Sequence, residues 1–379
     1  MSHIVQMRKN IESMNSMCGF SVIIVCCSNS YLSNYWQNRL ELGRGTIVAE
    51  NAIILTVFED WPGGAGNGLG TLYAFQNARL LALERHNIDI SEKLNDSTMS
   101  VALYHTAGKG TRLAPLPGSE NNNKPGVKLP GILKLNNKNV PITILESVIK
   151  QTGSYASSRL GRVSVFWGDQ IFIPTVDVGY IPKYHADILC SLGPMLSAED
   201  WASKGMDKYG LIATMASGSV QSAAQVEKVT HATAVDLLKD LGDIESVGVS
   251  LGSFSISSYM LNALLAEYQP ELERKEGKLD TDPHFWMPMT LPRASYIYLM
   301  SEKQVPETTS GPHYDRISAM VEKYNLGGSN TSTNTTNAEA VAKGITGLFG
   351  PCDVGNDIYW WDYGQLKYYQ KNALLVNAK

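Results

Sequence analysis

The chain has 379 residues, of which 44% are hydrophobic and 18% are charged, and its formal net charge is -4 at pH 7. This is the composition of a globular protein with ample apolar residues for a buried core. The negative charge argues against a nucleic-acid partner, because contacts to a phosphate backbone need a basic surface. No apolar run approaches the ~20 residues of a membrane-spanning helix, and 1–15 lacks the pattern of a signal peptide. We therefore expect a cytoplasmic protein without a membrane partner.

The first half of the chain predicts an alternation of strands and helices. The predicted strands are short apolar runs rich in β-branched residues, at 21–27, 52–58, 99–105 and 163–167. The predicted helices are amphipathic stretches at 31–42, 71–87 and 142–151. Strands that alternate with helices are typical of parallel strands joined by crossover helices. The expected fold class is therefore α/β, with a doubly wound, mainly parallel sheet.

After about residue 175 the pattern changes to short strands and helices in mixed order. These predicted elements lie at 211–215, 225–229, 233–241, 247–257 and 258–267. We expect one domain over 19–379, made of halves 19–175 and 176–379, with a smaller mixed β region in the second half. Residues 1–18 would be an N-terminal extension. The polar, glycine-rich run at 327–336 predicts a flexible loop near 325–340.

The strongest local motif is the run Tyr-His-Thr-Ala-Gly-Lys-Gly-Thr-Arg-Leu-Ala-Pro at 104–115. A strand that feeds a glycine loop lets backbone N–H groups converge on an anion, and an arginine adds a fork of charged donors. The order is not that of a Walker P-loop, because Lys109 is followed by glycine. A simple strand–turn–helix connection is the competing interpretation. The expected phosphate-binding residues are Ala107, Gly108, Lys109, Gly110, Thr111 and Arg112.

This run resembles the glycine–arginine–lysine signature of the sugar-1-phosphate nucleotidyltransferases. The resemblance includes Lys-Pro at 124–125 and Val-Lys-Leu-Pro at 127–130. It implies that Arg112 and one lysine act on the phosphates of the nucleotide. Lys128 is our choice for the catalytic lysine, with Lys124 as the alternative. It also implies that the first half of the domain binds the nucleotide and the second half binds the sugar.

Two aspartates match the metal-binding positions of that family. The run Val-Phe-Trp-Gly-Asp at 165–169 resembles a strand that ends in a metal-binding aspartate, here Asp169. The run Trp-Trp-Asp-Tyr-Gly-Gln at 360–365 resembles the segment that carries the second one, here Asp362. Mg²⁺ is usually held by one or two carboxylates together with substrate phosphates. Taken alone, each aspartate would more often belong to a turn or a helix cap.

The sugar-binding positions of the family also have counterparts, in the same order along the chain. Tyr-Gly at 209–210 resembles the strand whose glycine backbone meets the sugar, and Glu-Lys at 227–228 resembles the pair that takes sugar hydroxyls and sugar phosphate. The implied sugar-phosphate-binding residues are Tyr209, Gly210, Glu227, Lys228 and Gly252. The acidic, aromatic run at 280–286 either shapes the sugar site or caps a helix.

The order of one motif departs from that of most of the family. The run Gly-Asn-Gly-Leu-Gly at 66–70 resembles the base-binding loop, yet it precedes the phosphate loop, as in fucose-1-phosphate guanylyltransferases. The resemblance implies that the base contacts Gly66, Gly68, Leu69 and Gly70. The run lacks the GxGxxG spacing of a dinucleotide-binding fold, which disfavours a nicotinamide-dependent oxidoreductase.

The expected activity is formation of a nucleoside diphosphate sugar and pyrophosphate from a nucleoside triphosphate and a sugar-1-phosphate, with Mg²⁺ as cofactor. Such a transfer needs no protein nucleophile, because positioning and electrostatic stabilisation supply the catalysis. Two alternatives stay open: transfer to another phosphate acceptor such as phosphocholine, and a non-catalytic regulatory protein that binds a nucleotide sugar. The sequence also leaves open the base, the sugar and whether the protein forms a homo-oligomer.

Overall fold

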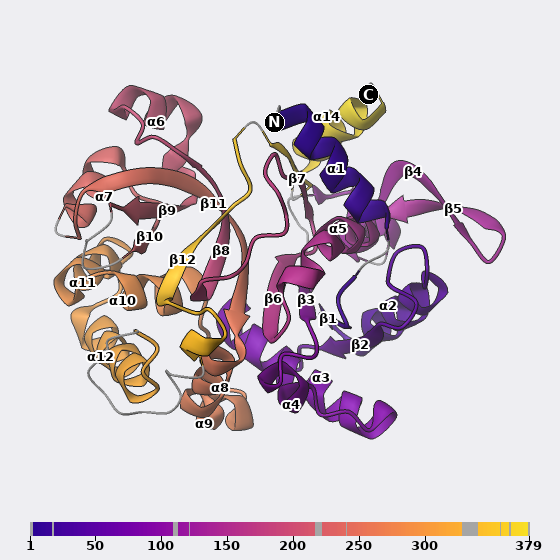
Figure 1. Cartoon of the computed structure of the whole chain (residues 1–379), viewed down its shortest axis with the longest axis horizontal. Helices are drawn as coiled ribbons and strands as arrows, with labels where there is room; N and C mark the ends of the chain where they lie inside the picture. The colour runs from indigo at the N-terminus through magenta and orange to yellow at the C-terminus, as the bar shows by residue number, and fades with distance from the viewer. Residues whose placement is uncertain are drawn as a thin grey trace. The chain divides into compact units, whose positions relative to one another are not determined.

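The computed structural model (Figure 1) describes residues 3–16, 19–108, 113–120, 122–216, 222–239, 241–327, 340–356, 358–363 and 365–377. The chain forms two compact units. Unit 1 contains Met1–Gly64, Tyr73–Tyr180 and Asp357–Lys379, and unit 2 contains Ala65–Leu72 and Ile181–Asn356. The main change of unit, after Tyr180, lies near the change of sequence pattern at about 175. Two short segments, however, belong to the unit of the opposite half.

Unit 1 is built on a parallel sheet, which bears out the predicted α/β class. Its strands run in the order β2-β1-β3-β6 and are β1 (Val22–Cys27), β2 (Ile53–Phe58), β3 (Val101–His105) and β6 (Arg162–Trp167). Val22 of β1 pairs with Ile53 of β2 on one side and with Val101 of β3 on the other. The pairings β1–β2, β1–β3 and β3–β6 are all parallel. Every residue of β1 is buried, which explains why this strand reads as a continuous apolar run.

Helices and two antiparallel strand pairs complete unit 1. The helices are α1 (His3–Asn15), α2 (Ser30–Leu42), α4 (Ile90–Asn95), α5 (Ile144–Thr152) and α14 (Leu366–Asn377), and α3 (Gly66–His86) lies in this unit from Tyr73 onward. The strand pairs are β4 (Lys128–Leu135) with β5 (Lys138–Thr143), and β7 (Gln170–Ile173) with β13 (Tyr359–Asp362). Helix α1, within the expected N-terminal extension, contacts α5 (Figure 1). The buried amide of Asn10 donates to the carbonyl oxygens of Pro174 and Val176, both at 2.8 Å.

Unit 2 contains a mixed sheet in the order β10-β9-β11-β8-β12. The strands are β8 (Tyr184–Gly193), β9 (Gly210–Met215), β10 (Ala223–Glu227), β11 (Ile244–Ser257) and β12 (Gly347–Asp353). All of these pairings are antiparallel except that of β12 with β8. The helices are α6 (Ala198–Lys204), α7 (His231–Leu238), α8 (Ser258–Glu267), α9 (Gln269–Arg274), α10 (Met287–Thr290), α11 (Arg293–Glu302) and α12 (Glu307–Lys323). Trp201, Leu211 and Met287 belong to one buried cluster between these elements.

One predicted boundary was wrong. The helix expected at 71–87 is α3, and it begins at Gly66. The run at 66–70, expected to be a loop, therefore forms the first turns of that helix. The reason is a contact distant in sequence: the Leu279 carbonyl accepts from the N–H of Gly68 at 2.8 Å, and Asp280 Oδ1 accepts from the N–H of Asn67 at 3.0 Å. These acceptors satisfy N–H groups that a helix N-terminus leaves unpaired.

The loop predicted near 325–340 lies largely outside the described residues, which stop at Gly327 and resume at Ala340. Its flexibility therefore stays a prediction. Among the described residues, no helix is long and apolar enough to cross a membrane.

Candidate functional site

The first group of predicted site residues lies at the carboxyl ends of β3 and β6 in unit 1. These strands are parallel neighbours with His105 opposite Trp167, so the segments that follow them leave the sheet at the same edge. The N–H of Gly168 donates to the carbonyl oxygen of His105 at 3.2 Å. A Cβ atom on Gly168 would lie only 3.0 Å from that oxygen. Glycine therefore permits the close approach that brings Asp169 beside the start of the predicted phosphate loop.

The phosphate loop itself is described only at its start. Ala107 is half-buried, and Gly108 is exposed, with nothing within 4 Å of the place where a Cβ atom would stand. The remaining predicted phosphate ligands, Lys109, Gly110, Thr111 and Arg112, lie outside the described residues. Their roles stay predictions.

The two predicted metal-binding aspartates are neighbours along the backbone of a strand pair. Strand β7 begins directly after Asp169, and β13 ends at Asp362, which pairs with Gln170. The N–H of Tyr363 donates to the carbonyl oxygen of Asp169 at 2.9 Å. Two segments that are far apart in sequence therefore meet at the carboxyl end of β6. The side chain of Asp362 is not among the described parts of the chain.

Lys124, rather than Lys128, contacts the predicted metal ligand. The ammonium of Lys124 forms an ion pair with Asp169 Oδ2, and the two side chains are 14% and 20% exposed. Lys128 instead pairs with Glu120, a residue that sequence reasoning did not single out. The structure thus places Lys124, our alternative, beside Asp169, and which lysine acts on the phosphates stays a prediction. No spacing rule in the sequence would have distinguished them, because the two partners, Asp169 and Glu120, are brought to the lysines by the fold.

The donor set at this place suits a hard cation such as Mg²⁺. Among the described residues, no group of three or more His, Cys, Asp or Glu side chains is placed to hold a metal ion. Mg²⁺, however, is commonly held by one or two protein carboxylates and completed by waters and substrate phosphates. Asp169, with the backbone of Asp362 beside it, matches that smaller requirement. Lys124 is the cation that an incoming metal ion would displace from the Asp169 carboxylate.

The second group of predicted residues lies in unit 2, where β9 and β10 pair. Glu227 stands opposite Gly210, and the N–H of Lys228 donates to the carbonyl oxygen of Tyr209 at 3.0 Å. Glu227 Oε1 and Lys228 Nζ are 2.7 Å apart, and this contact raises the pKa of Lys228. Lys228 has a φ of 55°, a left-handed conformation that costs energy for a residue with a Cβ atom. Such strain is frequently found at functional sites.

Gly252 belongs to the same neighbourhood. It lies in β11 with a φ of 75°, and its N–H donates to Ser250 Oγ at 3.1 Å. The pairing register of β11 shifts between Ser250 and Phe254, so the glycine sits in an irregular part of the strand. Ser250 in turn faces Gly210, since a Cβ atom on Gly210 would lie 3.5 Å from the Ser250 Cβ. Gly210, Glu227, Lys228 and Gly252 are thereby brought into one region of unit 2.

The acidic run at 280–286 both caps a helix and joins this second group. Asp280 Oδ1 accepts from the N–H of Asn67, in the first turn of α3. Asp282 begins a wide π-helical turn, Asp282–Trp286, in which the N–H of Met287 donates to the Asp282 carbonyl. Burial raises the pKa of Asp282 to about 7, and Glu227 and Asp280 act in the same direction while Lys228 opposes them. A π-turn is itself often associated with function.

The predicted base-binding residues pack against their own chain. The N–H groups of Gly68 and Leu69 both point to the Leu279 carbonyl, at 2.8 and 3.4 Å. A Cβ atom on Gly68 would lie 3.0 Å from the ring of Phe285. Leu69 and Gly70 are buried. Gly66 and Gly68 are therefore required by close packing on 279–285, whether or not a base also contacts this turn.

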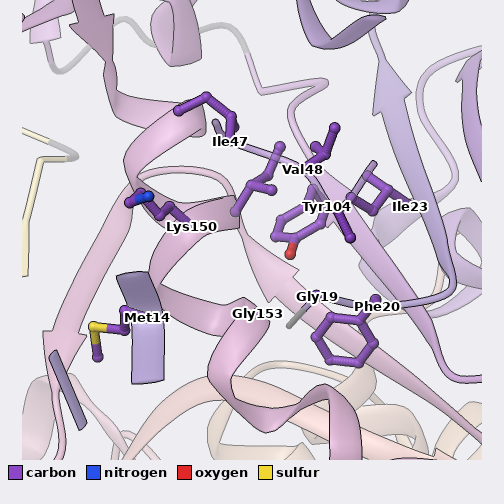
Figure 2. A pocket seen from close by; sticks show the side chains of 11 residues that line it. Met14, Gly19, Phe20, Ile23, Ile47, Val48, Tyr104, Lys150 and Gly153 are labelled. Atoms are coloured by element: carbon purple, nitrogen blue, oxygen red, sulfur yellow. The ribbon is translucent and has the colours of Figure 1, made fainter. Parts of the chain in front are cut away.

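A cavity of about 10 Å³ lies elsewhere in unit 1 and contains none of the predicted site residues (Figure 2). It is lined by apolar side chains such as Phe20 and Ile23, together with Tyr104 and Lys150. Lys150 Nζ donates to the carbonyl oxygen of Thr46 at 3.1 Å, and burial lowers the pKa of this lysine. A cavity of this size holds about one water molecule. It does not suit a nucleotide or a sugar.

No family model matches this chain, and no curated protein is similar enough to count as a relative. The functional assignment therefore depends on the arrangement of the chain's own residues and on the motifs that they form.

Proposed function

We propose that this protein is a Mg²⁺-dependent sugar-1-phosphate nucleotidyltransferase with a doubly wound, Rossmann-like nucleotide-binding core. The observation that carries the proposal is the meeting of separate motifs at the carboxyl ends of β3 and β6. The start of the glycine loop, Asp169, Lys124 and the backbone of Asp362 come from different parts of the sequence and gather there. Motifs that converge in space support a common function better than motifs that only share a chain.

The strand order of unit 1 supports a ligand at the same edge. In the order β2-β1-β3-β6, the direction of succession reverses between β1 and β3. In open α/β sheets, ligands bind outside the carboxyl ends of the strands at such a reversal. Thr106, directly after β3, donates its hydroxyl to the Cys26 carbonyl at 2.8 Å, which fixes the start of the loop against β1. The nucleoside triphosphate would lie on this edge, with its phosphates on the glycine loop and Arg112.

In the proposed reaction, an oxygen of the sugar phosphate attacks the α-phosphorus of the nucleoside triphosphate. The new P–O bond forms as the bond to the oxygen that bridges to the β-phosphate breaks, and pyrophosphate leaves. Asp169 and Asp362 would hold Mg²⁺, which supplies positive charge at the phosphates when bound. Lys124, once the metal ion has displaced it from the Asp169 carboxylate, would offset negative charge on the phosphates beside it. In unit 2, Glu227 accepts from sugar hydroxyls and Lys228 holds the sugar phosphate.

The proposal is tested by measuring pyrophosphate release, with Mg²⁺, over a matrix of nucleoside triphosphates and sugar-1-phosphates. We expect release with one base and a narrow set of sugars. Release with phosphocholine alone would instead indicate the other transfer reaction. Silence in every combination, with a nucleotide sugar still raising the melting temperature, would overturn catalysis and leave a binding protein.

A further inference from the structure

The C-terminal helix α14 carries a side chain, Tyr369, that contacts two separate segments of unit 1 near the candidate site. Its hydroxyl donates to the carbonyl oxygen of Lys128, the first residue of β4, at 2.5 Å. Its ring meets the ring of Tyr363 edge to face, with the centroids 6.0 Å apart. Burial raises the pKa of Tyr369, so the hydroxyl keeps the proton that it donates. Tyr369 therefore joins the start of β4 to the segment that follows β13.

Tyr363 continues this connection to Asp169. Its side chain is 0% exposed, and its N–H donates to the carbonyl oxygen of Asp169. The strand before it, β13, is paired with β7. Because its ring is buried and its main chain is bonded, Tyr363 has little freedom to move, and the ring that packs against it is held in place. The two tyrosines thus link the main chain of Lys128 to the main chain of Asp169.

Both candidate lysines lie in the short segment 124–128, which is also attached to other parts of unit 1. Just before it, the indole N–H of Trp36 donates to Asn123 Oδ1 at 3.2 Å. Within it, the carbonyl oxygen of Val127 accepts from the N–H of Ile144 at 3.0 Å. These two bonds hold the segment to α2 and α5. The tyrosine of α14 instead ties it to the part of the chain that bonds the predicted metal ligand.

We propose that Tyr369 is a positioning residue, which sets the spacing between the lysine segment 124–128 and Asp169. The inference rests on the proposed function, because it concerns how the same site is held together. Lys124 reaches the Asp169 carboxylate from this segment, so a shift of the segment would move its ammonium relative to the phosphates. A misplacement of about 1 Å in such a site can lower the rate by about 10²-fold.

The test compares Tyr369→Phe with a matched control, Tyr314→Phe. Tyr314, in α12 of unit 2, also donates its hydroxyl to a main-chain oxygen, that of Leu291 at 3.0 Å. Its ring also contacts a fully buried tyrosine, Tyr296, with the centroids 5.6 Å apart. Tyr369 and Tyr314 are both half-buried. Each substitution therefore removes one hydroxyl and one hydrogen bond to the main chain, and it keeps the packing of the ring.

Three quantities are measured: the melting temperature, pyrophosphate release with Mg²⁺, and hydrogen–deuterium exchange of the segments 124–130 and 359–363. Both variants should lower the melting temperature by about 1 to 3 °C, because each loses one hydrogen bond of the same kind. Only Tyr369→Phe should lower kcat, by about tenfold, with an unchanged KM for the sugar-1-phosphate, since the predicted sugar residues lie in unit 2. Only this variant should speed exchange in both segments.

The exchange measurement needs no turnover, so it separates this inference from the proposed function. Faster exchange in Tyr369→Phe with a wild-type kcat would overturn the positioning role and leave the proposed function standing. An equal loss of kcat in both variants would indicate general destabilisation and would also overturn that role. Faster exchange without pyrophosphate release by the wild type would retain the connection through the two tyrosines and overturn the catalytic function. Unchanged exchange in both segments would overturn the connection itself.

Discussion

The backbone N–H of Tyr363 donates to the carbonyl oxygen of Asp169 at 2.9 Å. This hydrogen bond joins the residue after β13 to Asp169, which lies between β6 and β7. The side chain of Asp169 is occupied on its other side by Lys124. One residue therefore connects a strand pair, a parallel sheet and an ion pair. Within unit 1, substitutions of Asp169 and its partners should affect function most.

Replacing Asp169 with asparagine should abolish turnover and leave the fold intact. The carboxylate is 20% exposed and its main-chain bond to Tyr363 does not involve the side chain, so the variant should fold. Loss of a charged group that acts on the phosphates typically costs about 10²-fold or more in kcat. Pyrophosphate release and the melting temperature measure the two effects. Asp177→Asn, at an exposed turn of the same unit, is the control and should be fully active. Normal turnover by Asp169→Asn would remove Asp169 from the site.

The two lysines should differ in their effect on catalysis. Lys124 contacts Asp169 and Lys128 contacts Glu120, so Lys124→Ala should lower kcat by about tenfold or more while Lys128→Ala changes it little. Steady-state kinetics at saturating substrates separate the two variants. The reverse order of effects would support Lys128, our first choice, over the lysine that the ion pairs indicate.

Lys228 should show a conflict between stability and binding. Its φ of 55° is strained for lysine and unstrained for glycine, so Lys228→Gly should increase the free energy of unfolding by about 1 kcal/mol. The same change should raise KM for the sugar-1-phosphate, because the ammonium is lost. Lys275, with a φ of 54° at the end of α9, offers the matched control: Lys275→Gly should be stabilised to a similar degree with an unchanged KM. Equal KM values for the two glycine variants would exclude Lys228 from the sugar-phosphate site.

The stability of unit 2 should depend on pH through Asp282. Its pKa of about 7 in the folded chain, raised chiefly by burial and by Glu227, lies above the ordinary value of 3.8. Between these values the folded state retains a proton that the unfolded state has released, so the stabilisation present at low pH is lost as pH rises through 7. The variant Asp282→Asn removes the titrating group. The difference in melting temperature between this variant and the wild type should therefore grow from about pH 5 to about pH 7 and then level off.

A constant difference over that range would mean that Asp282 titrates normally. Glu227, Lys228, Asp280, His284 and His313 face the same region, and all of them are retained in Asp282→Asn. Their own titration therefore contributes to both proteins and largely cancels in the comparison.

The architecture of unit 1 could be predicted because its elements are determined locally. The strand β1 is apolar at every position, since it is buried on both faces, and α5 begins with a capping box between Thr143 and Glu146. The start of α3 could not be predicted, because the acceptors that allow a helix to begin at Gly66 come from Leu279 and Asp280. Local sequence carries no signal of which distant segment will supply such acceptors.

The residues of the candidate site also differ in whether the sequence predicts them. Asp169, Glu227 and Lys228 can be predicted from short motifs, whose residues are adjacent in sequence. The π-helical turn that begins at Asp282 was missed, because the sequence at 280–286 indicated only a helix cap or a part of the sugar site. Gln225, which lies between apolar residues in Ala223–Glu227, was a signal in the sequence for a buried polar group.

The pairing of β13 with β7 also has a consequence for biosynthesis. Unit 1 is discontinuous: Asp357–Lys379 returns to it only after unit 2 has been made. During translation, β7 is synthesised long before β13 and has no partner strand until β13 follows. Asp169 likewise has no Asp362 beside it until that segment is made. A nascent chain that has completed unit 2 alone would therefore lack the second aspartate. Under the proposed function, catalytic competence would be acquired only after the segment Asp357–Lys379 has been synthesised and has joined unit 1.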